Sequence, residues 1–493
     1  MSKLLSCIFL LGLVSVYLLF GCGAVTNTTP ITPTTANFPV VVFSDLHFNP
    51  FYDPNLTTYP TLCTSADSSG WPSLFQGSTV TTPSVWGTDT NYPLLVLALA
   101  SIKQNLGASP LVIYSGDLIG HNFQSLYYQY CQGLPPVPPP SPSPQQVAAM
   151  QAFTDKTVAF VTGQIRAAIG NLPVLFAVGN VDSYTGYGPD STFLANTAET
   201  FYTQFVSGTV DQQTFLNTFT SGGYYSAQPL GSNLVVIGLN TNVMANGVPG
   251  DNDSAVAAEL SWLDSTLAST QTAGHKVWLL MHVPPGANTT ETASTIVSGQ
   301  PVTGSMMMYQ SYQTSFLQIL AKYPGLITMT LGAHTHMDEY RILSPSIVLD
   351  EVPAITPCFG ENPAFKIFTL TGNTLTPNDY SSLNYDLSKV PLPAQFNSYY
   401  TFSAAYSLQG PLGASLLQLY PQLANSISLI NTQPNAQQAL YMGQYNSGNT
   451  TLNPRPLPQG APWNPITNAN WPVFACGIGK MAQLDFEDCV NSY

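Results

Sequence analysis

Apolar runs and amphipathic segments alternate through the middle of the chain. Continuous apolar or β-branched runs, without a polar residue at every second position, are typical of strands that are buried on both faces. Such runs predict six strands, at residues 38–43, 111–114, 173–178, 234–239, 276–281 and 326–330. Helical spacing of apolar residues predicts helices between them, at 94–104, 146–168, 254–267 and 309–323. This alternation favours an α/β protein, layered as an α/β/α sandwich, with functional loops at the strand ends.

The pattern changes beyond about residue 372. Helices are expected there at 399–406, 413–430 and 436–445, separated by loops rich in Pro, Asn and Gly. This part of the sequence contains no cluster of metal-ligand residue types. We therefore expect one domain over residues 38–372 and a mainly helical C-terminal subdomain over residues 373–493, packed on that domain as a cap.

The N-terminal segment has the composition of an export signal. Lys3 precedes an apolar run over residues 4–20, which has the length of a signal peptide. Residues 19–22, Leu-Phe-Gly-Cys, then resemble a bacterial lipoprotein box in which Cys22 would be lipidated. The alternatives are ordinary signal cleavage nearby, or an uncleaved anchor slightly short of the roughly 20 residues that a membrane span needs.

The composition of the chain also indicates export from the cytoplasm. We expect a signal peptide over residues 1–21 and a lipoprotein-type tether, rich in Thr and Pro, over residues 22–37. Only 7% of the residues are charged, against about 25% in average soluble domains. This low charge density favours an exported protein, whether extracellular, periplasmic or a lipoprotein of the outer membrane. An acidic working environment is a further hypothesis, because few carboxylates would need to stay ionised there.

The charge balance excludes one class of partner. The chain has 11 Lys and Arg residues against 25 Asp and Glu residues, which gives a formal net charge of −14. Proteins that bind nucleic acid neutralise phosphates with clustered Lys and Arg side chains. No such cluster occurs in this sequence, so we expect no nucleic-acid partner.

Cysteine usage fits an oxidising compartment. Five of the seven cysteines lie beyond the N-terminal segment, and an odd number cannot all pair within one chain. Cys476 and Cys489 close a short C-terminal loop and are the best candidate disulfide. A pairing of Cys63 with Cys131 is possible and would leave Cys358 as a buried free thiol. No CxxC spacing suggests a structural zinc site.

Acidic residues, histidines and one asparagine follow directly after the predicted strands. They are Asp45, His47, Asp117, Asn180, His282, His334 and His336. A mixed set of nitrogen and oxygen ligands suits zinc, manganese or iron and does not suit calcium. Gly116 would let the backbone approach the ions closely, and a carboxylate at Asp117 could bridge two of them. Each motif alone is weak evidence, but the whole set in this order predicts a two-metal hydrolase site.

The set resembles the calcineurin-like metallophosphoesterase superfamily and, within it, the acid sphingomyelinase-like phosphodiesterases. The stretches that carry the resemblance are residues 44–50 (SDLHFNP), 115–117 (SGD) with His121, 239–242 (LNTN), 282–286 (HVPPG), 334–340 (HTHMDEY), 355–357 (ITP) and 362–365 (NPAF). The resemblance covers most of residues 38 to about 372, and the cysteine-closed tail is also similar.

The resemblance implies how the ligands divide between two cations. One cation would be held by Asp45, His47, Asp117 and His336. The other would be held by Asp117, Asn180, His282 and His334. Zinc is the first expectation for both positions, with manganese and iron as alternatives. Two such ions about 3.5–4 Å apart bind both oxygens of a phosphate and lower the pKa of a bridging water, which then attacks phosphorus in line.

One position departs from the family pattern. Residues 179–182 are Gly-Asn-Val-Asp, where the family usually has Gly-Asn-His followed by Asp or Glu. The missing histidine is thought to act at the leaving group, and Val181 cannot transfer a proton. His121 matches another family histidine near the substrate and is a candidate general acid. The alternative is that His121 is a structural histidine beside the site.

Three functions compete on these grounds. The first is a secreted or lipid-anchored phosphodiesterase that acts on a small phosphodiester, with phospholipids among the candidates and membrane contact through a lipidated Cys22. The second is an endopolyphosphatase-like hydrolase or a phosphomonoesterase, and it ranks lower because an acidic chain is a poor scaffold for a polyanion. The third is a non-catalytic surface lipoprotein on a decayed phosphoesterase fold, motivated by Val181. Retention of all seven ligand-type residues argues against decay.

Overall fold

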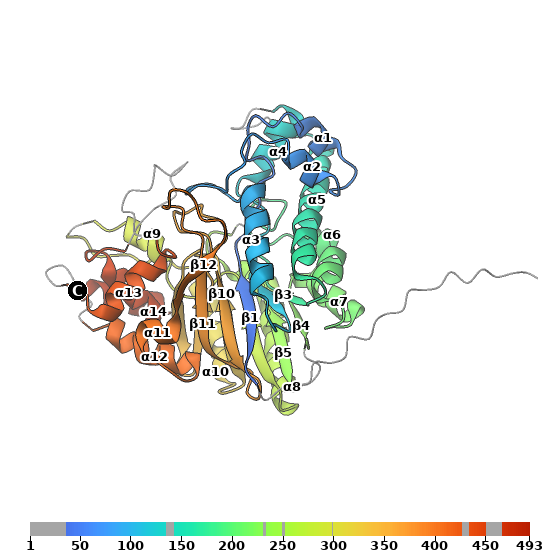
Figure 1. Ribbon diagram of the computed structural model, residues 1–493. Helices are drawn as coiled ribbons and strands as arrows, with labels where there is room; N and C mark the ends of the chain where they lie inside the picture. The colour runs from blue at the N-terminus through green and yellow to red at the C-terminus, as the bar shows by residue number, and fades with distance from the viewer. Residues whose placement is uncertain are drawn as a thin grey trace, which may run out of the picture. The chain divides into compact units, whose positions relative to one another are not determined.

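Two six-stranded sheets form the centre of the computed structural model (Figure 1). The structure describes residues 36–134, 142–229, 233–248, 252–297, 299–425, 433–449 and 466–493. The expected signal peptide, the lipid-accepting Cys22 and almost all of the tether lie outside these residues. Within them, no helix is both long enough and apolar enough to cross a membrane.

All six predicted strands are confirmed, three in each sheet. The first sheet has the order β12-β11-β10-β1-β2-β3, and the second has the order β4-β5-β6-β7-β9-β8. The strands of the first sheet are β1 (Phe38–Phe43), β2 (Val112–Tyr114), β3 (Val174–Phe176), β10 (Ala364–Thr371), β11 (Thr376–Asn384) and β12 (Asn397–Thr401). Those of the second sheet are β4 (Tyr225–Ala227), β5 (Leu234–Gly238), β6 (Lys276–Leu280), β7 (Ile327–Gly332), β8 (Tyr340–Ser344) and β9 (Ile347–Glu351).

Each of the six predicted strands has a parallel partner. Strands β1, β2 and β3 pair in parallel, and so do β5, β6 and β7. Antiparallel strands flank both sets, with β10 beside β1 and β4 beside β5. Parallel strands are buried on both faces and therefore appear as continuous apolar runs, which is why the sequence pattern found them.

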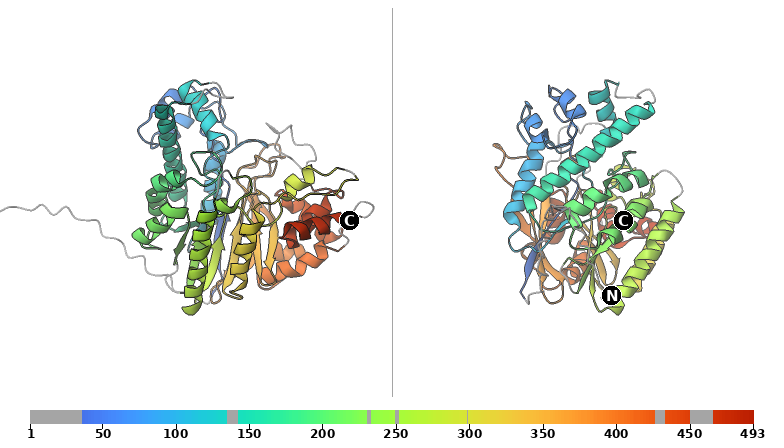
Figure 2. Two further views of the ribbon diagram at one scale, coloured as in Figure 1. Left: turned by 180° about the vertical axis from the view of Figure 1, so that it is seen from behind. Right: turned by 90° about the vertical axis from the view of Figure 1, so that its right-hand side faces the viewer.

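The two sheets pack against each other and against helices on their outer sides. The largest apolar core includes Val42 and Phe368 of the first sheet together with Trp278 of the second. A second core lies between β5, β6, β7 and the helices α8 (Asp253–Thr272) and α10 (Gln310–Ala321). Both helices are seen in front of the second sheet in the left view of Figure 2. The expected α/β layering is confirmed, and its central layer consists of two facing sheets.

The other predicted helices of the α/β part also form. They are α3 (Tyr92–Asn105) and α5 (Pro144–Ile169), which pack against each other. The long helix α5 begins with a capping box in which Ser143 and Gln146 bond to each other's backbone amides, and Pro144 occupies the first turn. The helices α6 (Ser191–Phe201) and α7 (Gln212–Gly222) follow β3, and α1 (Tyr59–Thr64), α2 (Trp71–Phe75), α4 (Phe123–Gln132) and α9 (Thr289–Ser294) are short.

The C-terminal region is mainly helical, but it also completes the first sheet. Strands β11 and β12 follow the expected boundary at residue 372, and β11 pairs antiparallel with β10. The helices after them are α11 (Phe402–Tyr406), α12 (Leu412–Leu423), α13 (Ala436–Tyr445), α14 (Trp471–Gly479) and α15 (Gln483–Asn491). The predicted helix at 399–406 therefore begins as strand, because residues 397–401 are paired to β11 through tertiary contact. Helix α12 contacts both β9 and β11, so this region binds to both sheets.

Both candidate disulfides are present. Cys63 on α1 is bonded to Cys131 on α4, and Cys476 on α14 is bonded to Cys489 on α15. Cys358 is a buried free thiol within the described residues, as expected. Two disulfides fit a protein that folds in an oxidising compartment.

Candidate metal centre

The seven predicted ligands come together at the carboxyl ends of the parallel strands. They follow β1, β2, β3, β6 and β7 directly: Asp45, His47, Asp117, Asn180, His282, His334 and His336. All are buried except His334, which is half-buried. In parallel sheets these ends share one edge, and loops from several strands can place side chains in one site there.

The first group of ligands contains Asp45, His47 and His336. Asp45 Oδ1 lies 3.4 Å from His336 Nε2 and 3.7 Å from His47 Nε2. Distances of this size between ligand atoms suit a shared cation, because each ligand atom would lie about 2 Å from the ion.

The second group contains Asp117, His282 and His334, with Asn180 between the two histidines. Asn180 Oδ1 lies 2.8 Å from His282 Nε2 and 2.7 Å from His334 Nδ1. His282 Nε2 is also 3.1 Å from Asp117 Oδ2. The amide oxygen and the carboxylate therefore face the same space as the two imidazoles.

Asp117 joins the two groups through one oxygen. Its Oδ2 lies 3.1 Å from His282 Nε2 in the second group and 3.3 Å from His47 Nε2, whose ring belongs to the first group. The other oxygen, Oδ1, accepts a hydrogen bond of 2.9 Å from the Val181 amide. A carboxylate held in this way presents a single free oxygen to both groups, and one carboxylate oxygen can bridge two cations.

The residues of the first group fit a bound cation. Asp45 and His47 are fully buried, and none of the described residues offers a hydrogen bond to either Asp45 oxygen or to either His47 ring nitrogen. A buried polar group without a partner costs about 1–3 kcal/mol, and more if it is charged. A divalent cation would satisfy the carboxylate and one imidazole nitrogen at once, so the donor set and its burial match a metal site.

Backbone conformation marks the same residues. Among the described non-glycine residues, nine have a positive φ, and five of these are predicted ligands. The five, with φ between 42° and 73°, are Asp45, His47, Asp117, His334 and His336. Residues other than glycine rarely adopt a positive φ, because this backbone conformation costs roughly 1–3 kcal/mol per residue. Residues that do adopt it cluster at functional sites.

Gly116 allows the close approach that its sequence position suggested. Its φ is +100°, and a Cβ atom there would lie 2.6 Å from His282 Nδ1 and 2.8 Å from the Gly179 amide nitrogen. Neither distance is compatible with a side chain, so β2 and β6 can bring Asp117 and His282 together only with glycine at this position.

Groups behind the ligands fix their orientation. His282 Nδ1 lies 2.7 Å from the Ser115 carbonyl, so this nitrogen carries the proton and Nε2 is free to bind a metal. The Asp182 carboxylate accepts hydrogen bonds from the amides of Asp117 and Gly179, both at 3.0 Å. Burial, and then the charge of Asp117, raises the pKa of Asp182 to about 6. Asp182 therefore ties together the two loops that carry Asp117 and Asn180.

The structure places His121 directly beside the metal ligands. Its ring stacks on His47 with a centroid distance of 4.1 Å, and its Nδ1 lies 2.8 Å from Asp89 Oδ1. Burial alone would lower the pKa of His121, but the charge of Asp89 and the hydrogen bond to it raise the pKa to about 9. Val181 is buried in the apolar core, so the position that departs from the family pattern serves packing in this chain.

A buried ion network beneath the site was not visible in the sequence. Lys366 Nζ lies 2.7 Å from Asp338 Oδ1 and 2.5 Å from Asp350 Oδ1. Arg341 pairs with Glu351, whose other oxygen accepts a hydrogen bond of 2.8 Å from the Thr335 hydroxyl. Thr335 lies between His334 and His336, so the network supports the loop that carries both histidines.

The C-terminal region holds two of the site's loops. The Tyr445 carbonyl, at the end of α13, accepts a hydrogen bond of 2.9 Å from the Asp338 amide. The next residues bind the loop before β10, where the Asn362 side chain donates to the Ser447 carbonyl at 3.2 Å. This region contributes no predicted ligand, but it braces the loop of the histidine pair and the loop that faces His336.

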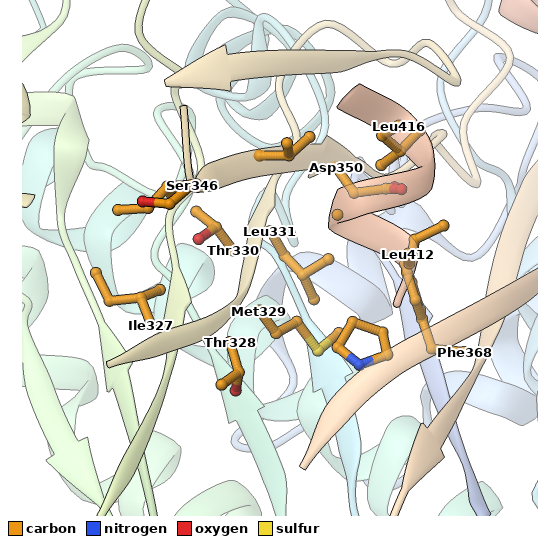
Figure 3. Close-up of a pocket in the computed structure, with 14 residues that line it drawn as sticks. Ile327, Thr328, Met329, Thr330, Leu331, Ser346, Asp350, Phe368, Leu412 and Leu416 are labelled. Atoms are coloured by element: carbon orange, nitrogen blue, oxygen red, sulfur yellow. The ribbon is translucent and has the colours of Figure 1, made fainter. Parts of the chain in front are cut away.

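A cavity of about 530 Å³ opens beside His334. Its walls come from the residues around α9 and from the loops after β7 and β9, and they include Thr289, Glu291, Met307 and Phe359. Cavities that bind small molecules typically measure about 300–1,000 Å³. By contrast, the cavity between β7, β9 and α12 shown in Figure 3 measures about 50 Å³, which is too small for a substrate. None of the residues that line it is a predicted ligand.

Comparison with known proteins agrees with the site. No family model matches the chain. Sphingomyelin phosphodiesterase B of Dictyostelium discoideum is 24% identical over 93% of this chain and 66% of its own length. The human cyclic GMP-AMP phosphodiesterase SMPDL3A is 26% identical over 69% of this chain and 68% of its own length. The bovine sphingomyelin phosphodiesterase is 24% identical over 68% of this chain and 48% of its own length.

The chain thus spans about two thirds of the first two relatives and about half of the third. A solved dimetal phosphatase from Danio rerio aligns with 73% of the chain at 10% identity and a TM-score of 0.39, which is too low a likeness to support a conclusion. The sequence relatives and the assembled ligand set lead to one assignment. The chain is similar in sequence to the acid sphingomyelinase-like phosphodiesterases, and these relatives together with the candidate ligand clusters support a metal-dependent phosphoric ester hydrolase.

Proposed function

We propose that the protein is an exported two-metal phosphodiesterase. The observation that carries this proposal is the position of Asp117 Oδ2, which faces an imidazole of each ligand group. Asp45, His47, Asp117 and His336 would hold one cation, and Asp117, Asn180, His282 and His334 would hold the other. Two divalent cations supply Lewis acidity and an activated water when bound. Zinc is the expected metal, with manganese or iron as alternatives.

The cavity beside His334 supports a diester as the substrate. A diester carries two substituents on phosphorus, and a space next to the ligands can receive one of them. Both substrates in the relatives' names, sphingomyelin and cyclic GMP-AMP, are phosphodiesters. None of the described residues that line this cavity is Lys or Arg, and Glu291 contributes a negative charge. This described lining offers no cation to a polyphosphate chain, which supports a small diester, with phospholipids among the candidates.

The test is hydrolysis of bis-p-nitrophenyl phosphate beside p-nitrophenyl phosphate, with zinc, manganese or a chelator. We expect cleavage of the diester that a chelator abolishes and that added metal restores. A clear preference for the monoester would instead support a phosphomonoesterase. Absence of both activities in protein with bound metal would support the non-catalytic lipoprotein. Export and lipidation of Cys22 are tested separately, by detergent partitioning of the intact protein and of a Cys22→Ser variant.

We further propose that His121 is the general acid. Its Nδ1 is held by Asp89, so the proton on Nε2 remains available for the leaving oxygen. His121→Ala is expected to reduce kcat about 10²-fold or more on a diester with a poor leaving group such as methanol. The same variant should lose much less on a p-nitrophenyl ester, whose leaving group needs no proton. An equal loss on both esters would contradict the acid role and favour a structural one.

A further inference from the structure

His336 has a partner behind it that no sequence motif suggested. Its Nε2 faces the first ligand group, 3.4 Å from Asp45 Oδ1. Its Nδ1, on the opposite side of the ring, lies 3.1 Å from Glu361 Oε1. Both side chains are buried, at 1% and 0% exposure, so water does not compete for this contact.

The loop that carries Glu361 is held in place from two directions. Asn449 donates a hydrogen bond of 2.5 Å to the Gly360 carbonyl, and the Asn362 amide donates to the Asn446 carbonyl at 3.3 Å. Trp86 Nε1 donates to the Asn362 side-chain oxygen at 3.2 Å. These hydrogen bonds hold the backbone on both sides of Glu361. The buried Glu361 carboxylate therefore occupies a defined position.

Among the described residues, one other polar side-chain group lies within hydrogen-bonding distance of His336 Nδ1. The Cys358 thiol lies 3.5 Å away, and sulfur is a weak hydrogen-bond acceptor. The carboxylate is the nearer and the stronger acceptor. A proton on Nδ1 would therefore be directed to Glu361, which leaves the Nε2 lone pair directed at the ligand group.

One histidine of the other ligand group, His282, has a different partner. His282 Nδ1 bonds to a neutral acceptor, the Ser115 carbonyl, at 2.7 Å. A carboxylate behind a metal-bound imidazole raises its basicity more than a carbonyl does, and it holds the ring orientation. His336 and His282 therefore differ in their support, and of these two only His336 has a replaceable side chain behind its Nδ1.

We propose that Glu361 is a positioning residue for the cation held by Asp45, His47, Asp117 and His336. It fixes the tautomer and the orientation of His336 and strengthens that ligand. The proposal rests on the two-metal function proposed above. It predicts that loss of Glu361 weakens one cation position selectively, because His282 retains its own carbonyl partner.

The test is a zinc titration of metal-free protein in competition with a chromophoric chelator. Glu361→Leu removes the acceptor at similar volume and should weaken one of the two zinc positions about 10–100-fold, with the other unchanged. Glu361→Gln retains an acceptor oxygen without the charge and should show a smaller loss. The matched control is Asp379→Asn, because Asp379 accepts a hydrogen bond from the Ser403 amide at 3.0 Å and touches none of the predicted ligands in any recorded contact. It should leave both positions unchanged.

The possible results separate the two proposals. If the unaltered protein binds no zinc, the two-metal function fails. If it binds two zinc ions and Glu361→Leu binds both with unaltered affinity, the positioning role of Glu361 is overturned. If Glu361→Leu does not fold, Glu361→Gln decides: a loss of about threefold or more at one position supports the role, and unaltered affinity at both overturns it.

Discussion

Replacement of Asp117 by Asn is expected to lower kcat/KM for a phosphodiester by about 10³-fold or more, or about 4 kcal/mol of transition-state stabilisation. Asp117 Oδ2 is the atom that faces both ligand groups, at 3.3 Å from His47 Nε2 and 3.1 Å from His282 Nε2. An amide nitrogen at that position cannot bridge two cations. Asn retains an oxygen that can accept the hydrogen bond from the Val181 amide, so the loop itself should persist.

The measurement is steady-state hydrolysis of bis-p-nitrophenyl phosphate together with metal content per chain. Asp379→Asn serves again as the control, because it makes the same chemical change far from the ligand set. We expect Asp117→Asn to lose activity and bound metal while its thermal unfolding without metal resembles that of the control. Full activity in Asp117→Asn would exclude Asp117 as a bridging ligand.

Replacement of Arg341 by Leu is expected to lower the free energy of unfolding by about 3–5 kcal/mol. Arg341 is 1% exposed. It pairs with Glu351 and donates hydrogen bonds to the carbonyls of Pro285 and Ala287 at 3.1 Å and 2.7 Å. Removal of the guanidinium would leave a buried carboxylate and two buried carbonyls without this partner. The loop after His282 would lose its hydrogen bonds to Arg341 on β8.

Urea unfolding followed by tryptophan fluorescence measures this effect. Lys322→Leu is the control, because Lys322 forms an exposed ion pair with Asp264 at 2.8 Å and such pairs contribute at most about 1 kcal/mol. The double variant Arg341→Leu/Glu351→Gln should recover part of the loss, since it removes the unpaired charge. An equal cost for Arg341→Leu and Lys322→Leu would show that the buried network contributes little to stability.

The prediction of strands from the sequence succeeded where a strand is buried on both faces. The runs at β1 and β6 have no polar alternation, and the structure pairs β1 in parallel with β2 and β6 in parallel with both β5 and β7. The pattern failed at β12, where Asn397, Ser398 and the tyrosines after them carry no apolar run. That strand forms because residues 397–401 pair with the free edge of β11. This pairing is a tertiary contact, so the sequence of β12 contains no pattern that predicts a strand.

The ligand set was predictable for a related reason. Asp45, Asp117 and His282 each follow a strand directly, and the carboxyl ends of parallel strands meet at one edge. Their order along the chain, and the resemblance that it carries, therefore indicated the chemistry before the fold was known. The position of Asp117 Oδ2, which faces an imidazole of each ligand group, is consistent with that prediction.

The supporting residues could not be predicted in this way. Glu361 and Arg341 contact the site across strand connections, and neither stands at a spacing that marks it. Their contacts arise because β8, β9 and the loop before β10 pack against the loops that carry His282, His334 and His336. The sequence by itself determined six of the twelve described strands, the disulfide candidates and the seven predicted ligands, because each depends on local pattern or chain order. Only the tertiary structure decided which buried charges stand behind the ligands, because that depends on which distant segments pack together.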